Sequence, residues 1–213
     1  MKSKFIRGQK VMYAESGREL RNSLAEHKTQ LLAQPGSAIA IATFDGMASV
    51  KNLVDAMTGK SMTERQALLR ENLRILVQHR TDNGKYSLIG GARELTESFE
   101  ATAFRELGEE TGLKLTDLLF MGMISGGDHM INVYPDGNAA EGLDALYFAL
   151  VPAGTVLRKN SETREFIYMS VNDIIENLPN WHPAQVATMD TLLRQILQIP
   201  EIYNLQNAEV PAW

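Results

Sequence analysis

Runs of apolar residues along the chain predict six strands. Each run is rich in Ile, Val, Leu, Phe or Tyr, and turn residues such as Gly, Asp, Asn and Pro bound it. The runs lie at 37–46, 72–84, 118–125, 129–134, 143–151 and 164–170. The second run ends in a turn at Asp82, Asn83 and Gly84.

Helical spacing, with apolar residues three and four positions apart, predicts helices in most of the remaining segments. These helices lie at 15–34, 50–57, 63–72, 98–111, 171–178 and 183–198. The first is expected to end at Pro35 and Gly36, and the tail from Pro200 stays unassigned. Because residues 47–71 are too long for a hairpin loop, we expect a helical insertion there, with Thr63 and Gln66 as a capping box.

One domain accounts for most of the chain. Its 213 residues are 44% hydrophobic, which suffices for one generous core, and no repeat or low-complexity linker divides them. The expected parts are an N-terminal helical extension at 1–36, a main domain at 37–198 that contains the insertion 47–71, and a C-terminal tail at 199–213.

Composition and charge narrow the class of protein. The absence of cysteine excludes disulfides, thiolate metal sites and cysteine nucleophiles, and it fits a reducing compartment. No stretch approaches the roughly 18 apolar residues of a membrane span, and the N-terminus lacks the apolar centre of a signal peptide. We therefore expect a soluble, cytoplasmic protein without membrane partners. The net charge of -5 argues against stable nucleic-acid binding, which depends on Lys and Arg.

Much of the acidity lies in residues 90–113, which hold six glutamates and only two arginines. On the helix predicted there, spacings of three and four residues bring Glu106, Glu109 and Glu110 onto one face. The opposite, buried face is expected to hold Ala101, Phe104, Leu107, Gly108 and Thr111. Clustered carboxylates repel one another, and a hard divalent cation such as Mg²⁺ relieves that repulsion through oxygen ligands. A solvated acidic helix face is the alternative interpretation.

The spacing of these residues favours the metal site. The stretch matches Gly-x5-Glu-x7-Arg-Glu-Leu-x-Glu-Glu-x-Gly-Leu at every fixed position, from Gly91 to Leu113. In this box the chain closely resembles the Nudix hydrolases. The resemblance extends over about residues 17 to 197, and HRTDNGKYSLIGGARELTES resembles the MutT-like phosphohydrolase subgroup. The insertion departs from that pattern.

The resemblance implies a fold and a set of residue roles. The fold is of the α/β (α+β) class, a Nudix α/β/α sandwich with a mixed sheet and the box as loop, helix, loop. Mg²⁺ or Mn²⁺ is expected as the cofactor. The implied metal ligands are Glu106, Glu109, Glu110 and the carbonyl of Gly90. Glu97 and Arg105 are expected to pair, while Gly91 and Gly112 provide backbone freedom.

Other residues complete the predicted site. The candidates for the general base are Glu106, Glu162 and Glu165, with Glu162 favoured and Glu141 weaker. The candidates for substrate binding are Arg80, Tyr86, His129 and Tyr134. Ile89 stands where the family usually has proline before its glycine pair, which predicts a looser entry into the box.

The resemblance implies hydrolysis of the diphosphate linkage in a nucleoside diphosphate derivative, with a nucleoside triphosphate as the first expected substrate. The alternatives are ADP-ribose, another nucleotide sugar or a dinucleotide. A non-catalytic nucleotide sensor and an enzyme acting on RNA 5′ ends are competing functions, and the latter predicts a basic track beside the site. A homodimer is a possible assembly.

Overall fold

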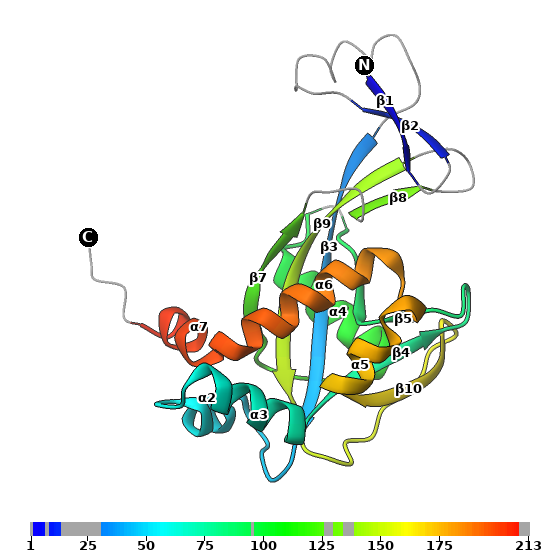
Figure 1. Ribbon diagram of the computed structural model, residues 1–213. Coiled ribbons are helices and arrows are strands. Elements are labelled where there is room, and N and C mark those ends of the chain that lie inside the picture. The colour runs from blue at the N-terminus through cyan, green and yellow to red at the C-terminus, as the bar shows by residue number, and fades with distance from the viewer. Residues whose placement is uncertain are drawn as a thin grey trace.

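The computed structural model describes residues 2–6, 9–13, 31–94, 96–125, 130–133 and 139–208 (Figure 1). Its strands are β1 (Lys2–Ile6), β2 (Gln9–Tyr13), β3 (Leu31–Phe44), β4 (Leu73–Arg80), β5 (Tyr86–Ser87), β6 (Ile89–Ala92), β7 (Leu119–Ser125), β8 (Ile131–Val133), β9 (Ala139–Leu150) and β10 (Thr163–Ser170). Its α-helices are α2 (Val50–Met57), α3 (Met62–Asn72), α4 (Phe99–Thr111), α5 (Val171–Asn177), α6 (Pro183–Gln195) and α7 (Ile199–Gln206). Two short 3-10 helices are η2 (Leu178–Asn180) and η3 (Ile196–Gln198).

The central sheet is mixed, as predicted. Its main path runs β10-β4-β3-β9-β7, and β5, β6 and β8 pair with β4, β3 and β9. The long strands β3 and β9 run parallel, whereas the other pairs are antiparallel. The strands predicted from the sequence all occur in the sheet, although β3 and β9 begin earlier than expected.

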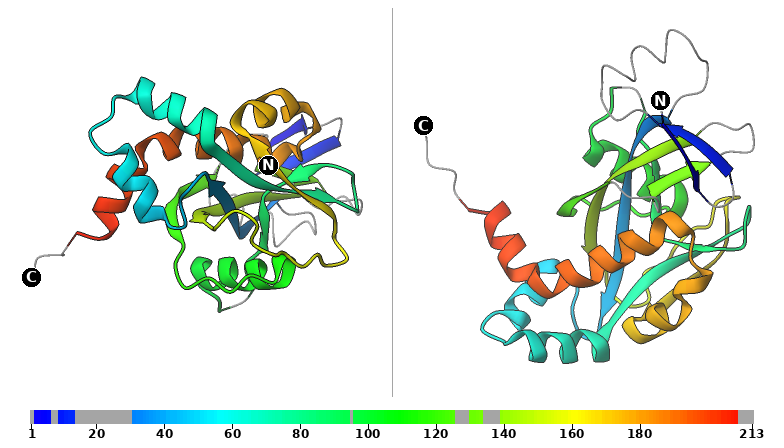
Figure 2. Two further views of the ribbon diagram at one scale, coloured as in Figure 1. Left: turned by 90° about the horizontal axis from the view of Figure 1, so that it is seen from below. Right: turned by 45° about the horizontal axis from the view of Figure 1, so that its top comes forward.

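Helices cover both faces of this sheet, so the fold is an α+β sandwich. The left view of Figure 2 shows α4 on one side and α3, α5 and α6 on the other. Successive side chains of β3 point to opposite faces of the sheet, so this strand contributes to a core on each face. Ile39 and Ile41 pack with Ala103 and Leu107 of α4. Ala38, Ala40 and Ala42, which alternate with these isoleucines along β3, belong to the second core. There they join apolar residues of α2, α3, α5 and α6.

The predicted N-terminal helix is wrong where the structure describes it. β3 already begins at Leu31, and residues 2–6 and 9–13 form a hairpin; residues 14–30 lie outside the described chain. Pro35 and Gly36, expected to end a helix, lie inside β3. The Pro35 carbonyl accepts a hydrogen bond from the Arg93 backbone, and Gly36 allows close packing beside Asp144. Pairing with β9 thus overrides the local Pro-Gly signal.

The insertion is helical, as predicted, but the N-terminal cap of its second helix, α3, differs from the predicted one. Ser61 caps α3 and exchanges hydrogen bonds with Glu64, so Thr63 and Gln66 do not form the capping box. Two carboxylate oxygens make Glu64 a strong acceptor for the backbone N–H of Ser61. Within the described residues, no helix has the length and apolar character that a membrane crossing requires.

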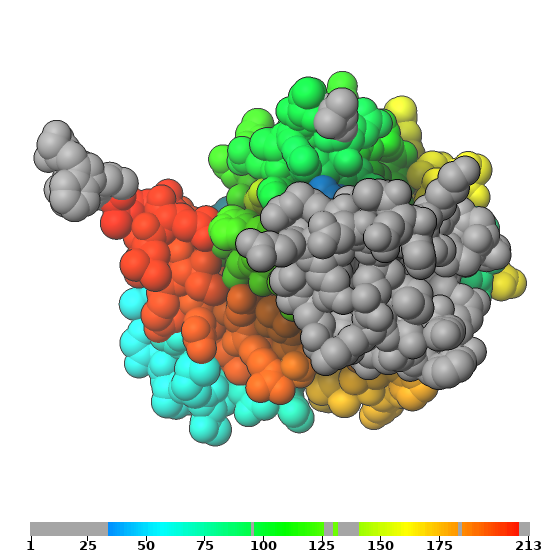
Figure 3. Space-filling view, turned by 90° about the horizontal axis from the view of Figure 1, so that it is seen from above, coloured from blue at the N-terminus to red at the C-terminus, as the bar shows by residue number. Residues whose placement is uncertain are grey.

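The tail that the sequence left unassigned contains helix α7, which packs on the insertion. Figure 3 shows the orange and red helices α6 and α7 beside the cyan insertion. Arg65 of α3 joins them and is only 7% exposed. Its guanidinium donates to the carbonyls of Met57 and Leu197 and to both carboxylate oxygens of Glu201. One buried cation therefore fastens the insertion to the C-terminal helices.

Replacing this cation is expected to destabilise the protein. Arg65→Met keeps an apolar stem but removes one donor from each of two carbonyl groups and the cation that pairs with Glu201, and each lost partner costs about 1–3 kcal/mol. We expect the free energy of unfolding in urea to fall by about 2–4 kcal/mol. Arg194→Met is the matched control, because the exposed Arg194 only pairs with Asp190 on the same helix. It is expected to change stability by no more than about 0.5 kcal/mol, and equal losses in the two variants would contradict the prediction.

Candidate functional site

The acidic helix of the box begins and ends as the sequence predicts. Ser98 accepts a hydrogen bond from the backbone N–H of Ala101 at 3.0 Å, which caps the first turn of α4. Gly112 ends the helix with a φ of 72°, a left-handed conformation that glycine adopts without strain. Helix α4 packs on β3 and β6, and Gly90 and Gly91 of β6 lie against its carboxylates.

The buried face of α4 differs from the expected one. Glu110 is 3% exposed and faces the sheet, whereas Ala101 and Gly108, expected to be buried, are exposed. Ala103 and Leu107 flank Glu110 on the buried arc. Helical spacing places Glu106, Glu109 and Glu110 on one face of α4, as predicted. It does not show that the sheet covers part of this face. The carboxylates therefore lie at the margin of the core.

Glu110 has polar partners on two strands. Its Oε2 accepts from the Gly90 backbone N–H at 3.1 Å, and its Oε1 accepts from Gln78 Nε2 at 3.4 Å. Gln78 is itself fully buried and also bonds Ser87 and Thr163. Burial raises the pKa of Glu110 to about 7, and the nearby charges of Glu106 and Glu162 add to the effect. The site thus holds a carboxyl group that is costly to ionise.

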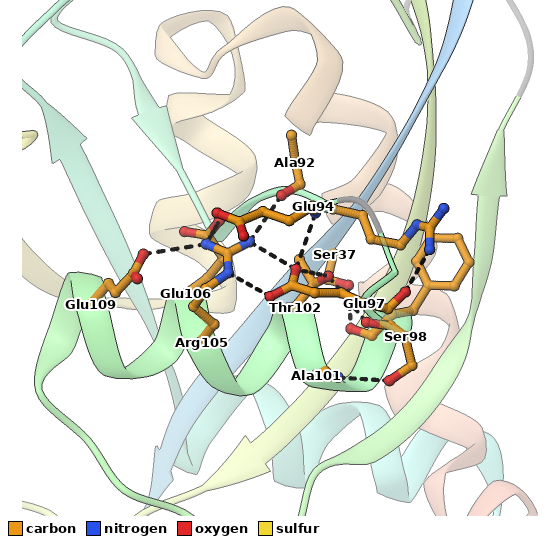
Figure 4. Close-up of polar contacts among 12 residues, drawn as sticks. Ser37, Ala92, Glu94, Glu97, Ser98, Ala101, Thr102, Arg105, Glu106 and Glu109 are labelled. Carbon is orange, nitrogen blue, oxygen red and sulfur yellow. Dashed lines mark hydrogen bonds and ion pairs between the residues drawn. The ribbon is translucent and has the colours of Figure 1, made fainter.

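Arg105 is the centre of the polar network shown in Figure 4. It donates to both oxygens of Glu97, at 2.9 and 3.2 Å, and to the Ala92 carbonyl at 3.0 Å. It also contacts Glu106 at 2.7 Å and Glu109 at 3.2 Å. The hydrogen bonds from Arg105 hold the pKa of Glu97 at about 2. One guanidinium therefore ties the loop before α4 to the helix.

The carboxylates of Glu106 and Glu109 both turn toward Arg105. Glu106 is largely buried and Glu109 is 60% exposed. Burial raises the pKa of Glu106, while Arg105 opposes that shift. Over the described part of the chain, no three acidic or histidine side chains meet at metal-ligand spacing. The three predicted glutamate ligands thus lie at one end of α4, but their oxygens do not converge on a common point.

The glycine pair brings the backbone close to these carboxylates. A Cβ on Gly91 would lie 2.3 Å from Glu106 Oε1, so a side chain at this position would displace the Glu106 carboxylate. Ile89, at the position where the family usually has proline, is fully buried and pairs with Ile39 of β3. Ile89 therefore packs into the core at the entry to the loop, and a loosening or redirection of the loop by the missing proline stays a prediction.

A cleft of about 450 Å³ opens beside the box loop. Its lining comes from β3, β6, β9, the turn after β4 and the start of α6. Gly90, Gly91 and Arg80 all line it. The volume falls within the range of small-molecule sites, roughly 300–1,000 Å³. A ligand in this cleft therefore contacts the box loop directly.

Some of the predicted site residues outside the box lie near it, and others do not. Arg80 pairs with Asp82 and lies 4.0 Å from a carboxylate oxygen of Glu162. Glu162 is exposed, and its charge contributes to the raised pKa values of Glu106 and Glu110, so it lies near the box. Glu165 instead pairs with His79 at 3.1 Å. These contacts favour Glu162 over Glu165 as a partner of the box.

Tyr86 is not among the residues that line the cleft; its ring packs against His79 and Trp181. His129 and Tyr134 lie outside the described residues, so their predicted roles stay predictions. Sequence reasoning missed Gln78 and Asp144, which line or support the site from β4 and β9. The only signal for either is a polar residue inside an otherwise apolar strand pattern.

Fold and site together define an α+β protein with an acidic helix beside a cleft of ligand size. The family model of the NUDIX domain matches residues 66–192, more than half of the chain. The protein therefore belongs to the Nudix hydrolase family. It is 32% identical over 111 residues to a MutT-like protein of Streptomyces ambofaciens. That alignment covers 52% of this chain and 64% of the relative, which is less than two thirds of the relative's length.

Solved structures are similar in fold at lower identity. The NUDIX domain of Shewanella oneidensis NrtR, complexed with ADP ribose, is 12% identical with a TM-score of 0.53. The superposition covers 83% of this chain and 97% of that domain. A mutT/nudix family protein from Listeria innocua is 20% identical with a TM-score of 0.49, covering 84% and 100%.

The Glu97–Arg105 pair predicts how stability depends on pH. The pKa of Glu97 is about 2 in the folded protein and about 4.5 ordinarily, so its contribution is present above about pH 4.5 and is lost as pH falls toward 2. We expect Glu97→Gln to lower the urea midpoint at about pH 6, and the difference from wild type to shrink as the pH falls to about 3. Glu94→Gln, at an exposed position of the same loop, serves as the control. A difference that is the same at every pH would show that Glu97 acts only through packing.

Proposed function

We propose that this protein is a divalent-metal-dependent hydrolase that cleaves the diphosphate linkage of a nucleoside diphosphate derivative. The observation that carries the proposal is the position of Glu106, Glu109 and Glu110 at the end of α4, against a glycine loop that lines the cleft. Family membership supports the reaction class. Every fixed position of the box is present, which favours an enzyme over a non-catalytic sensor that has lost a box residue.

The donor set fits a hard divalent cation. Glu106, Glu109, Glu110 and the Gly90 carbonyl would hold it through oxygen atoms alone, which suits Mg²⁺ or Mn²⁺ and not a softer metal. Crowding and burial disfavour the ionised carboxylates, as the raised pKa values of Glu106 and Glu110 indicate. When bound, the cation supplies charge neutralisation, polarises phosphoryl oxygens and lowers the pKa of a bound water.

The chain's own residues supply positioning and proton transfer. Arg105 holds the loop on the helix through Glu97, which keeps Gly90 and Gly91 at the edge of the cleft. Arg80 presents a cation on the cleft wall, where it attracts phosphate groups. Glu162 is the proposed general base, because it is exposed, lies beside Arg80 and is close to the box carboxylates.

A nucleoside triphosphate is the substrate that we propose first, which the similarity to a MutT-like protein favours. ADP-ribose, another nucleotide sugar or a dinucleotide is the alternative. RNA 5′-end processing fits less well. Among the described residues that line the cleft, Arg80 is the single arginine or lysine, so no basic track for several nucleotides leads from it.

The proposal is tested by hydrolysis of a nucleotide panel. Nucleoside triphosphates, nucleotide sugars and dinucleotides are incubated with Mg²⁺ or Mn²⁺, and phosphate release is measured with and without added phosphatase. We expect metal-dependent turnover, and a loss of about 100-fold in kcat/KM in Glu109→Gln because a transition-state interaction worth about 3 kcal/mol is removed. Glu100→Gln, an exposed position in the first turn of the same helix, is the control and should keep wild-type activity.

Metal binding gives a second measurement that is independent of turnover. We expect Mg²⁺ or Mn²⁺ to raise the melting temperature of the wild type and of Glu100→Gln, and to raise that of Glu109→Gln less. Metal-induced stabilisation without hydrolysis of any nucleotide in the panel would favour the sensor over the enzyme. Equal stabilisation of all three proteins would place the metal elsewhere.

A further inference from the structure

Gln78 is a buried amide beneath the box, and the proposed hydrolysis assigns it no part. It lies in β4 two residues after Leu76, so strand alternation turns both side chains toward α4. Leu76 fills this face with apolar atoms, whereas Gln78 brings an amide that is 0% exposed. An apolar side chain would fill the same space without the cost of desolvating an amide. Packing alone therefore does not account for the amide.

The partners of this amide fix its orientation. Its Nε2 faces Glu110 Oε1 at 3.4 Å and donates to Thr163 Oγ1 at 2.7 Å. Its Oε1 accepts from the Ser87 hydroxyl at 3.0 Å. Turning the amide over would place its Oε1 against the Glu110 carboxylate, acceptor against acceptor. The donor end of the amide is therefore committed to a carboxylate of the box.

Hydrogen bonds continue from Thr163 into the loop that holds Glu162. Because Thr163 Oγ1 accepts from Gln78, its own proton is free to donate to Asn160 Oδ1, 3.1 Å away. The same Oδ1 accepts from the Glu162 backbone N–H at 3.0 Å. The backbone of Glu162 is thus tied to the amide of Gln78 through the side chains of Thr163 and Asn160.

The amide therefore connects two groups that come from distant elements. Glu110 belongs to α4, whereas Glu162 lies in the loop before β10. A general base works only within hydrogen-bond reach of the water it deprotonates, so the position of Glu162 relative to the box matters. Its exposed carboxylate lies 4.0 Å from Arg80, which is a weak constraint at that distance. The position of Glu162 thus depends on the backbone that Gln78 helps to anchor.

We propose that Gln78 is a positioning residue, which holds the Glu110 carboxylate of the box and the loop of Glu162 in place relative to each other. The inference rests on the proposed function, because the roles of Glu110 as a metal ligand and of Glu162 as the base belong to it. Hydrogen-bond partners of metal ligands typically contribute roughly 10- to 100-fold to metal affinity or activity. An amide that serves both groups affects metal binding as well as the chemical step.

Gln78→Met tests the amide, because methionine has a similar volume and no NH₂ group. Mn²⁺ binding without nucleotide is measured by isothermal titration, and kcat is measured on the nucleotide that the panel identifies. We expect the Kd for Mn²⁺ to rise about tenfold and kcat to fall about tenfold or more. Arg65→Met is the control, because it is expected to destabilise the contact between the insertion and the C-terminal helices and should keep both values. Equal changes in the two variants would show that Gln78 acts only through stability.

Thr163→Val separates the two ends of the link and decides the question if Gln78→Met does not fold. Valine nearly keeps the shape of threonine but removes the acceptor for Gln78 and the donor to Asn160. We expect kcat to fall about tenfold with an unchanged Kd for Mn²⁺, since the contact of the amide with Glu110 is retained. Thr163→Ser keeps the hydroxyl and should restore the wild-type kcat. An unchanged kcat in Thr163→Val, or a loss that simply adds to that of Glu162→Gln, would overturn the link to Glu162.

The outcomes separate the inference from the proposed function. A raised Kd for Mn²⁺ in Gln78→Met, without hydrolysis of any nucleotide by the wild type, supports the role of Gln78 at Glu110 and contradicts the hydrolase. Hydrolysis by the wild type, with Kd and kcat unchanged in Gln78→Met, overturns the inference and leaves the hydrolase intact. A wild type that neither binds Mn²⁺ nor hydrolyses a nucleotide contradicts both.

Discussion

The guanidinium of Arg105 is the interaction on which the site depends. It reaches the loop before the helix through Glu97 and Ala92, and the end of the helix through Glu106 and Glu109. Without it, the like charges of the box would face one another on a partly buried surface, and the loop would lose its attachment. Together with the pairing of Gly90 and Gly91 to β3, this side chain holds the box loop beside the cleft.

Helix α4 and the loop before it hold carboxyl groups in opposite electrostatic states. Hydrogen bonds from a cation keep the pKa of Glu97 far below its ordinary value, whereas desolvation raises that of Glu110 to about 7. Glu97 and Glu110 therefore have different roles, although they lie close together in the sequence. The ionised form of Glu97 is stabilised and holds the loop on the helix. The ionised forms of Glu106 and Glu110 are disfavoured, and a bound cation would stabilise them.

Local signals in the sequence predicted the box well and its surroundings less well. The caps at Ser98 and Gly112 and the shared helix face of the carboxylates depend on neighbouring residues, so spacing alone was sufficient. The strand at 31–36 was missed because its partner in β9 lies about a hundred residues away, and a local Pro-Gly pair outweighed it. The burial of Glu110 and the exposure of Asp144 to the cleft depend on which strands lie opposite, and no sequence period contains that information.

The parallel pairing of β3 with β9 has a consequence for folding kinetics. Strands this far apart along the chain meet only after a large loss of loop-closure entropy, so their pairing is expected to be a slow step. The box helix, in contrast, has its caps and charge partners within a few residues and can form early. Because Gly36 and Asp144 stand on opposite sides of this pairing, a partly folded chain has the acidic helix before it has the cleft.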